Sequence, residues 1–183
     1  MRIAVIGPQN TGKSTFVADF LKEFTTYTTP RETYRDMVKR KGLAINQKTN
    51  EESQRLIRDF LAEQIAEDKT KDILFDRCVL DNYVYTYAQY EKGLIDETFL
   101  KESEKVMYKN LDDLDVLILI PTAVSVPLVN DTLRDTDTVF IDRINCIFLE
   151  TLFTVAHRSM VKIIAIAGTR EQRIAQVHKS LKI

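Results

Sequence analysis

The sequence has few of the residues that build covalent or metal-based sites. It holds two cysteines, Cys78 and Cys146, and two histidines among 183 residues, and the cysteines lack a metal-type spacing. This scarcity argues against a disulfide framework and predicts reduced thiols, as in a reducing compartment. His157 and the cysteines show no nucleophile or metal arrangement, so we assign them to packing or to the surface.

Long apolar runs and strong net charge are also missing. The longest apolar run, Val116 to Pro121, is far too short to span a bilayer, and the chain enters an apolar run at Ile3 without a signal-peptide pattern. The net charge of −1 creates no overall field for nucleic acid or an anionic membrane, although a local basic patch stays open. We expect a cytoplasmic protein with no membrane partner. Monomer and homodimer both remain open.

No repeat or Pro/Gly/Ser-rich linker divides the chain, so 1–183 is expected to form a single domain. Apolar or β-branched runs predict five strands at 2–6, 25–29, 72–76, 115–121 and 161–168. Helical periodicity predicts helices at 13–23, 51–69, 79–90, 96–110, 136–158 and 171–181. Strands that do not alternate in polarity indicate a parallel α/β sheet covered on both faces, with ligands beyond the carboxyl ends of the strands.

The stretch GPQNTGKST, residues 7–15, follows the first strand and fits the phosphate-binding pattern G-x-x-x-x-G-K-[ST]. Gly7 permits a sharp turn out of the strand, and Lys13 supplies a cation for the β- and γ-phosphates. The Ser14 hydroxyl is placed to bind Mg²⁺. Backbone N–H groups that can surround the phosphates come from Asn10, Thr11, Gly12, Lys13, Ser14 and Thr15. The loop is therefore expected to hold a nucleoside triphosphate.

An Asp-Arg pair stands at the end of the third predicted strand. Asp76 stands where a carboxylate steadies the Mg²⁺ shell, and Arg77 could neutralise phosphoryl charge in transfer. A structural salt bridge is the alternative, because neither residue is comfortable unpaired at the end of a buried strand. On the helix that follows, Tyr83 and Tyr87 share a face that suits either a substrate pocket or core packing.

The segment PRETYRDM comes after the second predicted strand. Glu32 could accept the proton of an attacking hydroxyl or hold that hydroxyl in line, and Arg35 could bind an acceptor phosphate. The alternative is an exposed ion pair at a helix start. Tyr34 is a candidate pocket residue from its position. Gln54 extends an apolar helix stripe, where its amide either reads a base edge or faces solvent.

Two further segments carry arginines beyond strand ends. Arg134 lies in a polar stretch after the fourth strand, which suits a lid over the triphosphate or a plain solvated charge run. Gly168, Thr169 and Arg170 follow the fifth strand, where they could contact adenine through backbone and guanidinium or form a simple turn.

Taken in order, these segments resemble the small P-loop kinases, most of all the NadR-like, nicotinamide riboside kinase-like group with its AAA-type domain. The resemblance covers most of the chain and is carried by GPQNTGKST, PRETYRDM, FDRCVLDNYVY, DTLRDTD with IDRI, and IAGTREQRIAQV. It implies a three-layer P-loop NTPase fold with a five-stranded parallel sheet in the order 2-3-1-4-5, helices on both faces and a small lid at about 125–143. It also implies ATP and Mg²⁺ as cofactors and a nucleoside-like phosphate acceptor.

The resemblance also implies roles for single residues. Lys13 and Ser14 would hold phosphates and Mg²⁺, and Asp76 would support the metal or act as base. Arg77 and Arg134 would stabilise charge, and Glu32 would orient the acceptor. In the family, the glutamate is usually followed by a tyrosine and a small residue before its arginine, whereas here Thr33 and Tyr34 intervene.

Three functions remain to be separated. The leading hypothesis is an ATP-dependent kinase that acts on a nucleoside, a nucleotide or a related small acceptor. The second is a kinase for DNA or RNA ends or modified bases, which the near-neutral charge disfavours. The third is an ATPase or nucleotide-dependent switch, although no guanine-reading Asn-Lys-x-Asp occurs.

Overall fold

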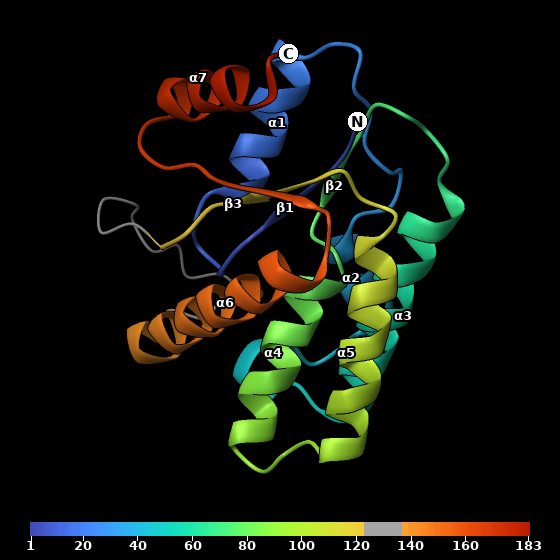
Figure 1. Ribbon diagram of the computed structural model, residues 1–183. Helices are drawn as coiled ribbons and strands as arrows, with labels where there is room; N and C mark the ends of the chain where they lie inside the picture. The colour runs from blue at the N-terminus through green and yellow to red at the C-terminus, as the bar shows by residue number, and fades with distance from the viewer. Residues whose placement is uncertain (123–136) are drawn as a thin grey trace.

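The computed structural model describes residues 1–122 and 137–183 as a parallel sheet between two layers of helices (Figure 1). In chain order the elements are β1 (Arg2–Ile6), α1 (Lys13–Glu23), α2 (Tyr34–Lys41), the short 3₁₀ helix η1 (Asn46–Lys48), α3 (Glu51–Glu67), β2 (Ile73–Asp76), α4 (Val79–Glu91), α5 (Glu97–Leu111), β3 (Val116–Leu119), α6 (Thr138–Arg158), β4 (Lys162–Ala165) and α7 (Arg170–Leu181).

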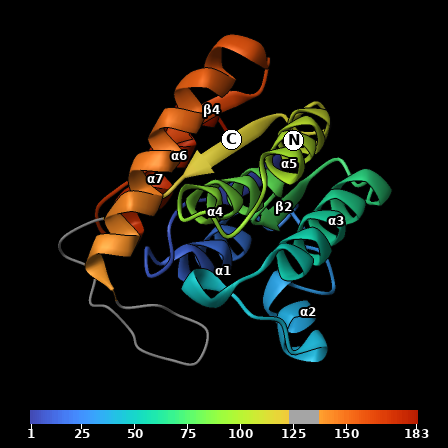
Figure 2. The same cartoon turned by 90° about the horizontal axis from the view of Figure 1, so that it is seen from below.

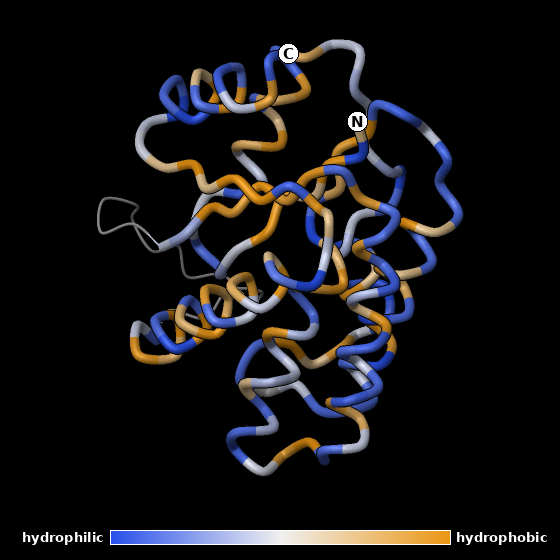
Figure 3. Tube along the Cα trace, in the orientation of Figure 1, coloured by the Kyte–Doolittle hydropathy of each residue, from blue (hydrophilic) through white to orange (hydrophobic). Residues whose placement is uncertain are grey.

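The sheet has the order β2-β1-β3-β4, and every pairing between these strands is parallel. Its strands are the most continuously apolar part of the described chain in Figure 3. Ile3 and Val5 pack with α1 and α7, whereas Ala4 and Ile6 pack with α3, α4 and α6 on the other face. The central strand β1 is thus buried on both faces, and the loop that leaves its carboxyl end opens at the middle of the sheet edge.

The helices divide unequally between the two faces. Figures 1 and 2 show α1 and α7 over one face, with α4, α5 and α6 under the other and α2 and α3 beside them. Phe16 and Phe20 anchor α1 to the sheet one turn apart, and Ile57, Leu61 and Ile65 do the same for α3. No helix in 1–122 or 137–183 is long and apolar enough to cross a membrane.

The fold differs from the prediction in its strand count. In residues 1–122 and 137–183 the sheet has four strands in the order β2-β1-β3-β4, where five in the order 2-3-1-4-5 are predicted. The strand predicted at 25–29 shrinks to one bridge between Thr28 and Ile73. Thr25 and Thr26 form a turn. Tyr27 then packs into an aromatic cluster, with its ring centroid 5.1 Å from that of Phe20. Pro30 then follows without an N–H to continue a ladder.

Helix α2 is not among the predicted helix ranges, although the alternative reading of Glu32 named a helix start here. Thr33 and Asp36 form a capping box at its start, with the Asp36 N–H donating to Thr33 Oγ1 at 3.2 Å, and Gly42 closes it with φ 62°. The predicted lid, 125–143, ends inside α6, which begins at Thr138. The rest of that lid, with Arg134, lies outside the described residues.

Candidate active site

The phosphate loop runs from β1 to α1 and bends through three positive φ angles, 139° at Gly7, 62° at Asn10 and 83° at Gly12. A Cβ atom on Gly7 would lie 2.3 Å from the carbonyl oxygen of Ile120, so only glycine fits there. Gly12 begins α1 without any side-chain cap. The first N–H groups of α1 are thus free of a capping side chain, which suits a bound anion.

Lys13 is the buried cation of this loop, with 6% of its surface exposed. Its ammonium donates to the carbonyl oxygens of Gly7, at 2.6 Å, and Pro8. Burial and then the positive charge of Arg77 lower the pKa of Lys13 to about 7, against the opposing effect of Asp81. The loop therefore holds an ammonium that readily loses its proton when no anion faces it.

Asp81 joins the phosphate loop to β2 and α4. Its carboxylate accepts the Gly7 N–H at 3.3 Å, the Cys78 N–H at 3.2 Å and the guanidinium of Arg77 at 3.3 Å. Burial raises the pKa of Asp81 to about 6, although Arg77 and Lys13 oppose this. One side chain, 1% exposed, thus fixes the position of the phosphate loop relative to Arg77.

Arg77 follows β2 directly in a left-handed conformation, with φ 86°. A residue with a Cβ adopts this conformation at a cost in backbone strain, here at the carboxyl edge of the sheet. The guanidinium lies 4.8 Å from the ring centroid of Tyr34 and 5.9 Å from that of Tyr85. The preceding residue, Asp76, pairs in register with Val5, and its charge acts on both Lys13 and Arg77. A carboxylate, a guanidinium and an ammonium thus meet at one edge.

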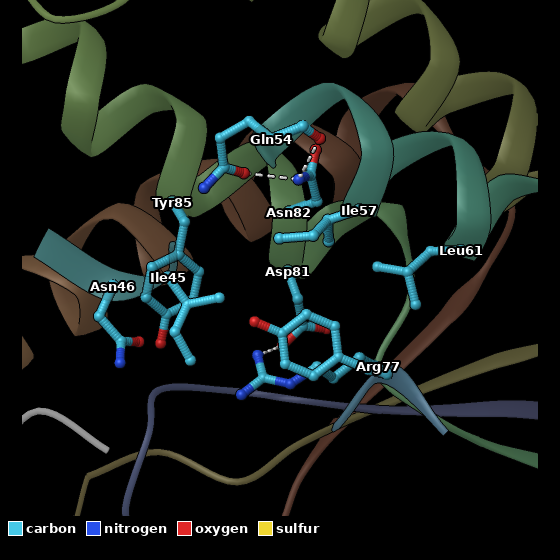
Figure 4. Close-up of a pocket in the computed structure, with 10 residues that line it drawn as sticks. Ile45, Asn46, Gln54, Ile57, Leu61, Arg77, Asp81, Asn82 and Tyr85 are labelled. Carbon is cyan, nitrogen blue, oxygen red and sulfur yellow. Dashed lines mark hydrogen bonds and ion pairs between the residues drawn. The ribbon is translucent and has the colours of Figure 1, made fainter. Parts of the chain in front are cut away.

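A small cavity lies beside this cluster. Arg77 and Asp81 lie at one end and the amides of Gln54 and Asn82 at the other, with Ile57 between them (Figure 4). The complete lining consists of Tyr34, Ile45, Asn46, Gln54, Ile57, Leu61, Arg77, Asp81, Asn82 and Tyr85. The cavity is therefore apolar along its walls and polar at both ends, as ligand sites commonly are.

The side chain of Gln54, on α3, is held in place by hydrogen bonds to the segment before α3 and to α4. Its Nε2 donates to Thr49 Oγ1 at 3.0 Å, and its Oε1 accepts from Asn82 at 2.6 Å and from Thr86 at 3.2 Å. The Asn82 amide nitrogen also donates to the Gln54 backbone oxygen at 3.0 Å, which fixes the orientation of that amide. Asn82 Oδ1 has no hydrogen-bond partner in the structure. The two amides form a rigid polar end to the cavity.

A second groove lies on the other side of the phosphate loop, against α7. It is lined by Thr11, Gly12, Thr15, Phe16, Asp19, Gly168, Thr169, Arg170, Gln172 and Arg173. Arg173 crosses from α7 and donates to the Thr11 carbonyl at 3.0 Å and to the Gly168 carbonyl at 3.1 Å. Arg170 pairs with Asp19 at 2.8 Å. The loop after β4 and the phosphate loop thus share one groove.

Most of the predicted site residues lie in these two regions. The phosphate-loop residues and Gly168, Thr169 and Arg170 adjoin the α7 groove, and Tyr34, Gln54 and Arg77 line the cavity. Asp76 and Arg35 lie close enough to act on the pKa of Lys13. Ser14 is exposed on the first turn of α1. In 1–122 and 137–183 no three His, Cys, Asp or Glu residues gather as a metal site.

Two predicted site residues lie elsewhere. The Glu32 carboxylate pairs with Arg40 at 2.8 Å in a separate groove between α2 and α3, outside the cavity. Tyr83 faces Tyr87, with ring centroids 6.3 Å apart, and burial beside Glu104 raises its pKa to about 12. Neither the Glu32 nor the Tyr83 side chain therefore lies beside Arg77. The ion-pair and packing alternatives describe what these two residues do in the structure.

Several residues of the site escaped the sequence reasoning, among them Asp81, Asn82, Tyr85 and Arg173. Tyr85 replaces Tyr83 at the cavity because α4 turns this face toward α3, and its hydroxyl bonds Gln9 of the phosphate loop. Asp81 stands three residues after Cys78, as the last member of a helix-start capping box. That spacing was the one local signal available for it.

These features agree with a comparison of the sequence with protein families. A family model described as an AAA domain matches residues 2–173. The chain belongs to this family. No protein with a curated description matches this AAA domain.

Several solved structures share the fold of this AAA domain. Deoxyadenosine kinase from M. mycoides with bound products has 18% identity and a TM-score of 0.73, over 100% of this chain and 98% of the kinase. NadR in complex with NR has 16% identity and a TM-score of 0.71, over 99% of this chain and 51% of NadR. Thymidylate kinase from Candida albicans has 17% identity and a TM-score of 0.64, over 98% of this chain and 91% of the thymidylate kinase. The resemblance to NadR-like P-loop kinases is thus confirmed at the level of family and fold.

Proposed function

We propose that this AAA domain is an ATP-dependent kinase that phosphorylates a hydroxyl or phosphate group of a nucleoside or nucleotide. The proposal rests on the hydrogen bonds of the Asp81 carboxylate. It accepts from the N–H of Gly7 in the phosphate loop and from the guanidinium of Arg77 at the adjacent cavity. The proposed triphosphate site and the proposed acceptor site would thus share one carboxylate. A nucleotide sensor needs only the first of these sites.

The phosphate loop fits a magnesium-bound ATP on its own geometry. The uncapped start of α1, the positive φ angles and the buried Lys13 supply N–H groups and a cation in one concave turn. Bound MgATP would supply the phosphoryl group for transfer. Lys13 would hold phosphate charge, Ser14 and Asp76 would support the ion through a hydroxyl and a carboxylate, and the α7 groove would receive the base.

The cavity suits one small acceptor. The chemistry of its lining supports this rather than its volume, because the cavity is smaller than a nucleoside in this structure and its side chains would have to move apart to admit one. Ile45, Ile57 and Leu61 can enclose a flat ring, while the fixed amides of Gln54 and Asn82 can read its polar edge. The comparison with a deoxyadenosine kinase and a thymidylate kinase agrees with this class of acceptor.

The charged end of the cavity would promote transfer by position and charge. Arg77, held by Asp81 and stacked over Tyr34, would stabilise charge on the group in transfer. Asp81 uses its oxygens on three donors and is a positioning residue. Asp76 is the carboxylate at this edge that would accept or orient the proton of the attacking hydroxyl. Glu32 has no part in this scheme, since its carboxylate pairs with Arg40 outside the cavity.

A thermal-shift panel tests this function. The protein is heated with a non-hydrolysable ATP analogue and Mg²⁺, alone and with each of a set of nucleosides, nucleoside monophosphates and short oligonucleotides. We expect the analogue to raise Tm and one nucleoside or monophosphate to raise it further. Stabilisation by oligonucleotides alone would replace the small acceptor with a nucleic-acid end. Stabilisation by the analogue with no acceptor in the panel, together with acceptor-independent hydrolysis of ATP, would favour the ATPase.

A further inference from the structure

Helix α6 carries a stripe of exposed, mostly apolar side chains that face away from the sheet. The stripe consists of Val139, Asp142, Cys146, Leu149, Phe153 and Ala156, all exposed. Val139 is 77% exposed, Leu149 50% and Phe153 71%, and Met160 just beyond the helix is fully exposed. Exposed apolar residues scattered singly are ordinary, whereas an aligned row of them marks a contact surface.

The opposite face of α6 already supplies the core. Ile144, Ile147, Phe148 and Val155 are buried against α4 and the sheet. The helix is therefore apolar on two faces, and Figure 2 shows it at the margin of the described part of the chain, with none of the labelled helices on its outer side. A helix with two apolar faces is normally covered on both, so the outer stripe calls for a partner.

The spacing of the stripe identifies the shape of that partner. Its members recur at alternating steps of three and four residues from Val139 to Ala156, which is the a/d pattern of a two-helix seam. Such a seam is covered by a second helix along its length. A flat sheet or a membrane surface would not require the alternation to be kept over five successive steps.

The charges beside the stripe favour a second copy of α6 that runs antiparallel. Arg143 and Glu150 occupy equivalent flanking positions one heptad apart, next to Asp142 and Leu149. In an antiparallel pair in which Cys146 meets the Leu149 position of the partner helix, these flanking positions face each other and bring opposite charges together twice. In a parallel pair they would face positions that carry no charge. Within one chain Arg143 already bonds Glu91, at 2.9 Å, and Glu150, at 3.3 Å, so the new contacts would extend an existing network.

We propose that the outer stripe of α6 forms a two-fold homodimer interface through antiparallel pairing of α6 with α6 of a second copy. The interface lies on the side of α6 away from the cavity residues, so each protomer would keep its own complete site. The proposal is independent of the kinase assignment.

The mass of the full-length protein in solution tests the proposal, by sedimentation equilibrium over a wide concentration range. We expect a dimer, with Phe153→Asp raising the dissociation constant by about a hundredfold. Leu94→Asp is the matched control, because Leu94 is 58% exposed on the loop between α4 and α5, and it should leave the dimer intact. A monomeric wild type at all concentrations, or a Phe153→Asp dimer as tight as wild type, would overturn the proposal.

A mixing experiment tests the antiparallel register and remains informative if one variant is less stable. Arg143→Glu alone and Glu150→Arg alone place like charges opposite each other and should weaken the dimer of each. When the two variants are mixed, every pair across the interface becomes attractive, so heterodimers should form several-fold more tightly than either homodimer. Circular dichroism confirms that both variants are folded. No gain on mixing would contradict the antiparallel pairing.

Discussion

Binding of a triphosphate should make this protein take up a proton, because Lys13 is buried with a pKa of about 7. Relative to 10.5, this pKa means that the folded chain disfavours the ammonium by about 5 kcal/mol. At pH 8 much of the free protein would therefore carry neutral Lys13. A polyanion in the loop stabilises the ammonium and restores its pKa, so binding should take up close to one proton.

Isothermal titration calorimetry measures this uptake directly. The ATP analogue with excess Mg²⁺ is titrated at pH 8 in two buffers with different ionisation enthalpies, and the dependence of the binding enthalpy on the buffer gives the number of protons. We expect about one proton for wild type and none for Lys13→Arg, whose side chain keeps its charge at this pH. Uptake of no proton by wild type, with normal binding, would refute the reasoning about the buried ammonium.

Three further substitutions separate structural from catalytic roles. Gly7→Ala should lower the free energy of unfolding by upwards of about 3 kcal/mol through backbone strain and a clash, whereas Gly42→Ala, with open space around it, should cost about 1 kcal/mol in a denaturant titration. Arg77→Lys should reduce kcat about a hundredfold while the KM for ATP stays within about threefold, since a lysine cannot keep the stacked geometry. A tenfold higher KM with unchanged kcat would instead make Arg77 a binding residue. Glu32→Gln should leave kcat unchanged and match Arg40→Gln in stability, because the ion pair they share lies outside the cavity; a large fall in kcat would return Glu32 to the site.

The sequence predicted the parts of the site that depend on local pattern. The phosphate loop needs a strand, a glycine-rich turn and a helix start, and all three are adjacent in the sequence. Asp76 ends a buried strand and Arg77 follows it, so the parallel topology alone places them at the carboxyl edge beside Lys13.

The remainder depended on tertiary contacts. Tyr83 and Tyr85 are equivalent in the sequence pattern, and only the rotation of α4 against α3 decides which one reaches the cavity. Gln54 and Asn82 come from two helices whose contact is long-range. The strand expected at 25–29 does not form, because Tyr27 packs into an aromatic cluster. β propensity alone does not predict such a tertiary contact.

The most direct test of the proposed kinase is transfer of phosphate to an acceptor by the purified protein. ATP, Mg²⁺ and each acceptor that raised Tm are incubated with wild type and with Lys13→Ala, and the products are identified by mass spectrometry. We predict one phosphorylated nucleoside or nucleotide with wild type, formed in step with ADP, and a rate at least about a hundredfold lower with Lys13→Ala. ADP without a phosphorylated acceptor, or equal product from both proteins, would contradict the account.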